Sequence, residues 1–467
     1  MRASNFREGC LFWHGISVIG VAFTGLFALL NMAQAHPLTT VYDFCSVKNC
    51  KDGAFPNGLV MDQTGNVFGI AGGGGVDHHS QGNGTVFELK NGKKFKLLYK
   101  FCTEANCLDG SGPVGNLVID TSGNLYGTTL LGGAHGQGTA FELSPTAHGV
   151  WSLHKLYDFC SGGAGCPDGG NPSGALTYVG ASTGVPYDGS SPLYGVGGEG
   201  GTGGNNALGV VFQLTPPQGR SSWSETVLYS FCIQGGTACT DGARPLGALL
   251  ADANGNLFGV TSAGGVNHPQ GFSAGAGVVF QLRSNTGVWN ENVIYNFCSQ
   301  QNCSDGAYPS AGLIEDSNGD LLGTTFYGGA NCLLDGTATS CGTIFQLTPD
   351  GANWQQSVLH TFCLQMDCPD GAGPTAPLLM GPGGALYSTT KAGGGNDGDP
   401  SHEGGGVLFK VDGASFEVVH SFCALANCAD GFFPFAGVVL TGSGLLLGST
   451  EEGGNAFSGG TVFKIKP

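Results

Sequence analysis

The sequence predicts an all-β protein, a seven-bladed β-propeller with four antiparallel strands in each blade. Three observations favour this fold: one pattern recurs seven times, each copy contains four strand-like runs, and no helical periodicity follows the first 35 residues. A β-solenoid is the alternative. Solenoid coils are usually shorter and more uniform, whereas the first cysteines of successive copies lie 57 to 72 residues apart. The copies begin near Tyr42, Tyr99, Tyr157, Tyr229, Tyr295, His360 and His420.

Each copy opens with a strand of the form Tyr-x-Phe or His-x-Phe that runs into the first cysteine, such as Tyr42 to Cys45. Four to six residues separate it from a second cysteine, which is followed by one residue and then Asp-Gly-x-x-Pro in every copy. We expect this segment to cross from the outermost strand of one blade to the innermost strand of the next. The histidines that replace tyrosine, His360 and His420, are expected at the surface.

Three more strands complete each copy. A run such as residues 58–62 leads to a turn, of the form Asp-x-x-Gly-Asn or Asp-x-x-Gly-Asp in four copies, where aspartate can accept backbone hydrogen bonds and glycine supplies a positive φ. The next strand carries Leu-Tyr-Gly-Thr-Thr or a relative. A glycine-rich loop of variable length then leads to a last strand of the type Gly-Thr-Val-Phe, as at residues 460–463.

The two ends of the repeat region predict how the ring closes. The first strand, residues 39–44, has no preceding hairpin partner, and the chain stops directly after the strand at residues 460–465. If Tyr-x-Phe is the outermost strand, this N-terminal strand completes the seventh blade. Strand direction then places the Asp-Gly crossings and the glycine-rich loops on one face of the disc, where we expect any function to lie.

The N-terminal 35 residues are typical of a secretory signal peptide. Arg2 and Arg7 precede an apolar stretch at residues 11–30, and the small-residue pattern Ala-Gln-Ala ends at Ala35. We therefore expect one mature domain, residues 36–467, that is exported to the periplasm or the extracellular space. A retained membrane anchor is the alternative, because the apolar stretch is long for a signal peptide.

The composition excludes several classes of partner. Glycine accounts for 86 residues and charged residues for only 11%, with a formal net charge of −17. Cleavage after residue 35 removes two of 17 basic and one of 34 acidic residues, which leaves 15 − 33 = −18. Phosphates would repel such a chain, so we expect no nucleic-acid partner and no membrane association after cleavage. We also expect a monomer.

The cysteines predict disulfides. Sixteen of the 17 remain after signal removal, and an even number in an exported protein favours pairing. Zinc is disfavoured, because each copy offers two thiolates and a tetrahedral site needs four ligands. The expected bridges are Cys45–Cys50, Cys102–Cys107, Cys160–Cys166, Cys232–Cys239, Cys298–Cys303, Cys363–Cys368 and Cys423–Cys428, with an eighth, Cys332–Cys341, across a glycine-rich loop.

The aspartates of Asp-Gly-x-x-Pro have two interpretations. They could form a ring of carboxylates that binds calcium or hydroxyl-rich ligands, or each could close a turn that directs proline toward the inner strand. A binding site would not require the residue in all seven blades, whereas blade construction would, so we favour the structural role. These residues are Asp52, Asp109, Asp168, Asp241, Asp305, Asp370 and Asp430.

Metal binding and catalysis find little support in the sequence. The densest cluster of candidate ligands is Asp397, Asp399, His402 and Glu403, in the glycine-rich loop of the sixth copy, but nothing there defines a ligand spacing. We therefore expect no cofactor, with calcium as the remaining candidate. No nucleophile elbow, zinc-protease motif, phosphate-binding loop or dinucleotide fingerprint is present, so we assign no catalytic residues.

The phrases Asp-Gly-x-x-Pro-x-x-Gly-Leu, Asp-x-x-Gly-Asn-Leu-Tyr-Gly-Thr-Thr and Gly-Thr-Val-Phe-x-Leu together resemble the Gloeo/Verruco tandem repeat of exported bacterial proteins in the choice-of-anchor tandem repeat class. The resemblance covers residues 41–467. It implies an exported, propeller-shaped surface or secreted protein, and it supplies no activity and no catalytic residues. The paired cysteines are an elaboration on the general pattern.

These observations favour a binding or scaffolding module over an enzyme. Loops that vary between blades on a rigid frame suit recognition of a carbohydrate or protein ligand. One alternative is an enzyme that acts on polysaccharides, a lyase or a hydrolase, which would need a convergent cluster of titratable groups. The other is a purely structural envelope protein without a ligand.

Overall fold

A computed structural model describes residues 37–467 except 77–81, 148, 203–207, 218–221, 235, 269–273, 331–340, 396–403 and 456–458. Contacts divide the chain into two units, residues 1–35 and 36–467, and the first lies outside the described residues. Within the described part of the second unit there is no α-helix; short 3-10 turns such as Lys48–Cys50 are the only helical segments.

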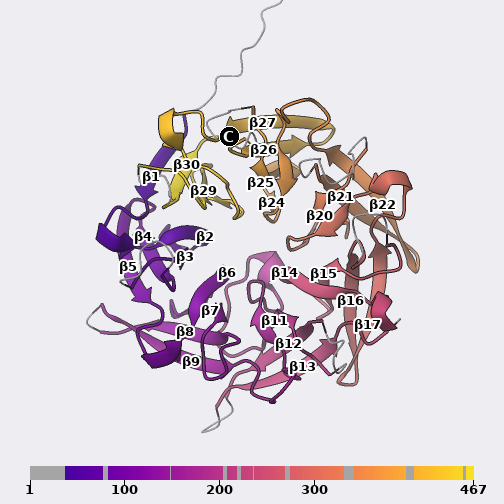
Figure 1. The fold of residues 1–467 in the computed structure, drawn as a ribbon, viewed down its shortest axis with the longest axis horizontal. Coiled ribbons are helices and arrows are strands. Elements are labelled where there is room, and N and C mark those ends of the chain that lie inside the picture. The colour runs from indigo at the N-terminus through magenta and orange to yellow at the C-terminus, as the bar shows by residue number, and fades with distance from the viewer. Residues whose placement is uncertain are drawn as a thin grey trace, which may run out of the picture. The chain divides into compact units, whose positions relative to one another are not determined.

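Seven antiparallel sheets stand around a central axis as the blades of a propeller (Figure 1), which confirms the predicted fold. From the axis outward, blade 1 contains β2 (Ala54–Met61), β3 (Val67–Gly73), β4 (Thr85–Lys90) and β5 (Lys94–Lys100), and blade 2 contains β6 (Ser111–Ile119), β7 (Leu125–Leu131), β8 (Thr139–Pro145) and β9 (Trp151–Asp158). Blade 3 contains β10 (Gly170–Pro172), β11 (Leu193–Glu199), β12 (Val210–Thr215) and β13 (Ser224–Ser230), and blade 4 contains β14 (Ala243–Ala251), β15 (Leu257–Ala263), β16 (Val278–Asn285) and β17 (Val288–Asn296).

The inner strand is interrupted in the later blades. Blade 5 has β18 (Ala307–Pro309) and β19 (Ile314–Glu315) inside β20 (Leu321–Tyr327), β21 (Thr343–Asp350) and β22 (Asn353–Thr361). Blade 6 has β23 (Ala372–Pro374) and β24 (Leu379–Met380) inside β25 (Leu386–Ala392), β26 (Val407–Asp412) and β27 (Ser415–Ser421). Blade 7 has β28 (Val439–Leu440), β29 (Leu446–Thr450) and β30 (Thr461–Ile465).

The N-terminal strand closes the ring as expected. β1 (Thr39–Asp43) pairs antiparallel with β30 and forms the outermost strand of blade 7, so Tyr42 faces Val462 in the register. The Tyr-x-Phe strand is therefore outermost in every blade. This arrangement ties the two ends of the domain together by main-chain hydrogen bonds.

The hydrophobic core lies between neighbouring blades. The phenylalanine of each Tyr-x-Phe or His-x-Phe strand is at most 1% exposed and packs on the phenylalanine of the Gly-Thr-Val-Phe strand in the following blade. Ring centroids in the seven pairs are 4.9 to 5.2 Å apart, within the range of favourable aromatic contacts. The pairs are Phe44–Phe87, Phe101–Phe141, Phe159–Phe212, Phe231–Phe280, Phe297–Phe345, Phe362–Phe409 and Phe422–Phe463.

A second contact between blades explains the proline of Asp-Gly-x-x-Pro. Each proline ring lies on the glycine that opens the Gly-Thr-Val-Phe strand of the preceding blade; a Cβ on Gly277, for example, would come within 2.8 Å of Pro309. Only glycine permits this approach. The residue before each proline donates its N–H to a carbonyl of the same preceding blade, at 2.7 to 3.1 Å. These donors are Phe55, Gly112, Asn171, Arg244, Tyr308, Gly373 and Phe433.

Truncating one phenylalanine of the core should destabilise the whole ring. We expect Phe297→Ala to lower the free energy of unfolding by about 3–5 kcal/mol, because it opens a cavity between blades 4 and 5. Guanidinium denaturation followed by tryptophan fluorescence would measure the change. The control is Val288→Ala in the same outer strand, where the side chain is 62% exposed and a change within about 0.5 kcal/mol is expected. Equal effects of the two substitutions would contradict this account of the core.

Candidate functional site

The disulfides lie in the loops that cross from one blade to the next. All seven Cys-x(4–6)-Cys pairs are bonded in the structure, which confirms those predictions. Cys341 also takes part in a disulfide, and its expected partner, Cys332, lies outside the described residues. Each confirmed bridge closes a loop of five to seven residues beside the Asp-Gly aspartate.

Each Asp-Gly aspartate accepts hydrogen bonds from its own crossing loop. Asp52 accepts bonds from the N–H groups of Ser46 and Val47, at 3.1 and 3.2 Å, and from the hydroxyls of Ser46 and Tyr42, at 2.8 and 2.9 Å. Because three of these bonds reach Oδ2 and one reaches Oδ1, all from the strand and loop that precede the aspartate, the geometry supports a role in building the loop. The equivalent residues, all but Asp370 fully buried, repeat much of this pattern: Asp109, Asp168, Asp241, Asp305, Asp370 and Asp430.

The two histidines of the outer strands are not surface residues, contrary to expectation. His360 and His420 are half-buried, and their Nε2 atoms lie 3.0 Å from the carboxylates of Asp370 and Asp430. They occupy the place of the tyrosine hydroxyl in the other blades. Burial alone would raise the pKa of Asp430, but hydrogen bonds from His420 and from backbone N–H groups lower it below its ordinary value.

Two buried glutamates lie beside these loops on the outer side of the ring. Glu225 and Glu291 come from β13 and β17, and Oε1 of each is buried without a hydrogen-bond partner among the described residues. Burial raises the pKa of Glu291 to about 8, and the nearby charge of Asp241 adds to the shift. In blade 5 the same position holds Gln356, which donates to the backbone carbonyl of Asp305 at 3.2 Å.

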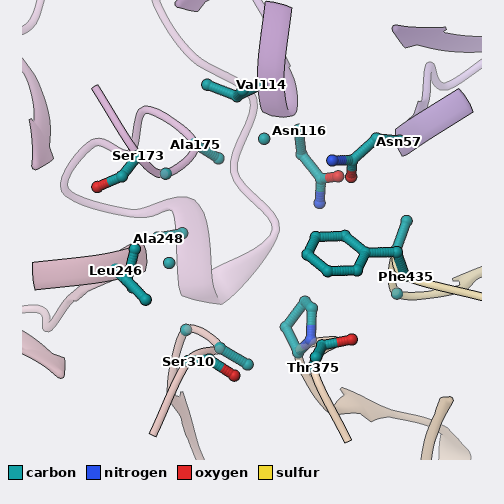
Figure 2. Close-up of a pocket in the computed structure, with 18 of the residues that line it drawn as sticks. Asn57, Val114, Asn116, Ser173, Ala175, Leu246, Ala248, Ser310, Thr375 and Phe435 are labelled. Carbon is teal, nitrogen blue, oxygen red and sulfur yellow. The ribbon is translucent and has the colours of Figure 1, made fainter. Parts of the chain in front are cut away.

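One of the described cavities lies on the axis of the ring. It has a volume of about 500 Å³ and receives one residue from every blade, the residue that directly follows the proline of Asp-Gly-x-x-Pro. Figure 2 shows these side chains around the cavity, with the ring of Phe435 directed into it. The seven residues are Asn57, Val114, Ser173, Leu246, Ser310, Thr375 and Phe435.

The mouth of the cavity is aromatic on one side. Tyr308, Phe326 and Tyr327 line it from blade 5, with ring centroids 4.6 to 6.3 Å apart. Phe55 and Phe435 line an adjoining cavity of about 280 Å³ between blades 7, 1 and 2. These residues lie where the crossings enter the inner strands and where the glycine-rich loops begin, which is the face that the sequence indicated for function.

One cation and one carboxylate break the symmetry of this mouth. Lys391 is the penultimate residue of β25, and Glu451 occupies the equivalent position directly after β29 in the next blade, whereas the other five blades have neutral residues there. The Lys391 Nζ lies 5.4 Å from the centre of the Phe433 ring. Burial raises the pKa of Glu451; Lys391 opposes the shift and Glu452 adds to it.

The repeated motifs do not single out the residues that line the cavity. These residues lie within three residues of the invariant proline or at the end of the strand of the Leu-Tyr-Gly-Thr-Thr type. A comparison of the seven copies at those positions would have shown them, because side chains there vary in size and charge while their neighbours do not.

The predicted metal cluster, Asp397, Asp399, His402 and Glu403, lies outside the described residues. Within the part of the chain that the structure describes, no three His, Cys, Asp or Glu side chains converge as metal ligands. In the same residues, no helix has the length and hydrophobicity needed to span a membrane.

Removing an Asp-Gly aspartate should destabilise its loop. We expect Asp241→Ala to lower the free energy of unfolding by about 2 kcal/mol or more, because the N–H groups of Ile233 and Gln234 and the Tyr229 hydroxyl lose their acceptor. Thermal denaturation compared with Asp412→Ala, an exposed aspartate in a surface ion pair, would measure the difference. An unchanged melting temperature for Asp241→Ala would contradict the structural role.

The buried glutamates should make stability depend on pH. Because folding raises the pKa of Glu291 from 4.5 to about 8, the folded state binds the proton of this carboxyl group more tightly than the unfolded state does. The contribution of that proton to stability is therefore lost as the pH rises from about 4.5 to about 8. We expect Glu291→Gln to reduce this loss and to raise the free energy of unfolding at pH 8 by about 1 kcal/mol. Melting temperatures at pH 5 and pH 8 test this, with exposed Glu417→Gln as the control; a parallel response of both variants would refute it.

Comparisons with known proteins give the family of the chain. Among solved structures, the chain is similar to a "putative 6-phosphogluconolactonase" from Bacteroides uniformis, with 11% identity, coverage of 78% of this chain and 83% of that chain, and a TM-score of 0.43. It is also similar to a "putative oxidoreductase (glucose dehydrogenase)" from Thermus thermophilus, with 16% identity, coverage of 77% and 94%, and a TM-score of 0.41. A protein of unknown function from Dyadobacter fermentans gives 13% identity, coverage of 92% and 99%, and a TM-score of 0.40.

No curated protein matches the chain. The sequence profile of the Gloeobacter/Verrucomicrobia repeat matches residues 24–191 and 268–467, which together make up most of the chain and include the repeated phrases described above. The chain therefore belongs to the Gloeobacter/Verrucomicrobia repeat family.

Proposed function

We propose that the mature chain is an exported binding module that holds a carbohydrate ligand in the central cavity, on the face of the crossings and glycine-rich loops. The observation that carries the proposal is the cavity of about 500 Å³ to which every blade contributes a residue that varies between blades. A concave site with aromatic walls and a few polar side chains is the usual form of a small-ligand site. The seven disulfides suit an oxidising compartment outside the cytoplasm.

The chemistry of the wall favours sugar over a strongly charged ligand. A pyranose ring has an apolar face of C–H groups and a rim of hydroxyls, which matches aromatic faces beside neutral side chains that both donate and accept hydrogen bonds. The cavity offers both, because Phe435 projects into it and the amides of Asn57 and Asn116 lie together on one side (Figure 2). Lys391 is the one charged residue among those that line it.

An enzyme acting on polysaccharides is the second candidate, and Glu451 favours it. A carboxyl group whose pKa is raised by burial can donate a proton to a glycosidic oxygen. Glu451 is such a group, and it lies at the mouth near Lys391. The same assay separates the two candidates, since an enzyme would release new chain ends and a binding module would not.

Binding to a panel of soluble polysaccharides and oligosaccharides, measured with residues 36–467 in calcium and again in chelator, tests the proposal. We expect at least one carbohydrate to bind, and we expect Leu246→Trp, which fills the cavity, to weaken binding roughly tenfold or more. The matched control, Val288→Trp on an exposed outer strand, should bind as the unaltered chain does.

Each result decides between named alternatives. Binding that is lost in chelator would make the module calcium-dependent, and release of chain ends that stops in Glu451→Gln would establish the enzyme. Absence of binding to every carbohydrate would refute the proposal and favour a protein partner or a structural role.

A further inference from the structure

We infer that Phe55 and Tyr308, the bulky residues that directly precede the proline in blades 1 and 5, are contact residues that determine ligand specificity and are retained at a cost in stability. The inference rests on the proposed function, because it names the residues that hold the carbohydrate at the mouth of the cavity. Three observations lead to it: the backbone conformation at this position, the two glycines that occur there, and the direction in which the side chains lie.

The backbone at this position is left-handed in every blade. Phe55 has φ 59° and Tyr308 has φ 58°, and the equivalent residues in the other five blades have φ between 50° and 64°. Residues with a Cβ seldom adopt such values, and a bulky one does so only where the surrounding structure enforces it. Strained residues of this kind cluster at ligand sites more often than elsewhere.

The frame itself does not need a side chain at this position. Its structural role is to donate a backbone N–H to the preceding blade, and Gly112 and Gly373 do so at 2.8 Å as well as Tyr308 does. Glycine adopts the left-handed conformation without strain. A sequence under selection for stability alone would therefore place glycine in all seven blades, yet five blades carry Phe, Asn, Arg, Tyr and Phe.

The side chains of Phe55 and Tyr308 extend to the mouth instead of into the core. Tyr308 lines the central cavity and Phe55 lines the adjoining one, and both remain partly exposed. Neither belongs to the phenylalanine pairs that hold the blades together. Each presents an aromatic surface beside polar groups, which is the chemistry that a neutral oligosaccharide requires.

Substitution by glycine and by alanine separates binding from strain. Tyr308→Ala removes the ring and keeps the strained conformation, whereas Tyr308→Gly removes both, so the difference in melting temperature between the two variants reports the strain. We expect the glycine variant to be more stable than the alanine variant and at least as stable as the unaltered chain. We expect both variants to bind the carbohydrate identified by the panel at least roughly tenfold more weakly, as measured by calorimetry. Phe55→Ala and Phe55→Gly should behave alike.

The reverse substitution controls for the backbone. Gly373→Ala places a Cβ at the same φ, at a position that is not among the described residues lining either cavity, so it should lower the melting temperature without changing carbohydrate affinity. Unchanged affinity in Tyr308→Gly and Phe55→Gly would overturn the inference and leave the proposed function intact. A Tyr308→Gly variant that is less stable than Tyr308→Ala would also overturn it, because the residue would then not be strained. If the unaltered chain binds no carbohydrate, both the proposed function and this inference fail.

Discussion

The propeller depends on the contact that joins each blade to the one before it. A proline lies on a glycine, the N–H before that proline bonds to the preceding blade, and two buried phenylalanines meet across the same seam. The contact recurs at all seven seams, including the one that Pro56 and Gly460 form between the two ends of the domain. Because a ring has no free end, every blade is held on both sides, and no single blade can open without breaking two seams.

This arrangement places all invariant residues in the seams and leaves the axis free to vary. The proline, the aspartate, the glycine after that aspartate and the glycine of the Gly-Thr-Val-Phe strand all fix the backbone conformation. None of them can change without loss of a hydrogen bond or of a close contact. The residues immediately before and after the proline have side chains that no seam uses. A cavity wall assembled from seven such positions can acquire specificity one residue at a time, while the frame that positions it stays constant.

The fold could be predicted from the sequence because its determinants repeat. Seven copies of Tyr-x-Phe or His-x-Phe, of Asp-Gly-x-x-Pro and of a strand related to Gly-Thr-Val-Phe indicate strand order, the crossings, the local disulfides and closure by residues 39–44. The cavity could not be predicted in the same way, because its residues are defined by how they differ between copies. The prediction that His360 and His420 lie at the surface was wrong. The sequence pattern does not show that the first residue of the Tyr-x-Phe or His-x-Phe motif contacts an aspartate ten residues later.

The acidic composition of the whole chain does not extend to the central cavity. The chain carries 17 basic residues against 34 acidic ones, yet the mouth of the cavity contains the cation Lys391 and the carboxyl group of Glu451, whose burial favours the neutral form. Much of the negative charge lies outside the cavity, including the buried aspartates of the crossing loops. The axis is close to neutral, and the selectivity of the site then depends on shape and hydrogen bonding. Those are the properties that the variable positions beside each proline control.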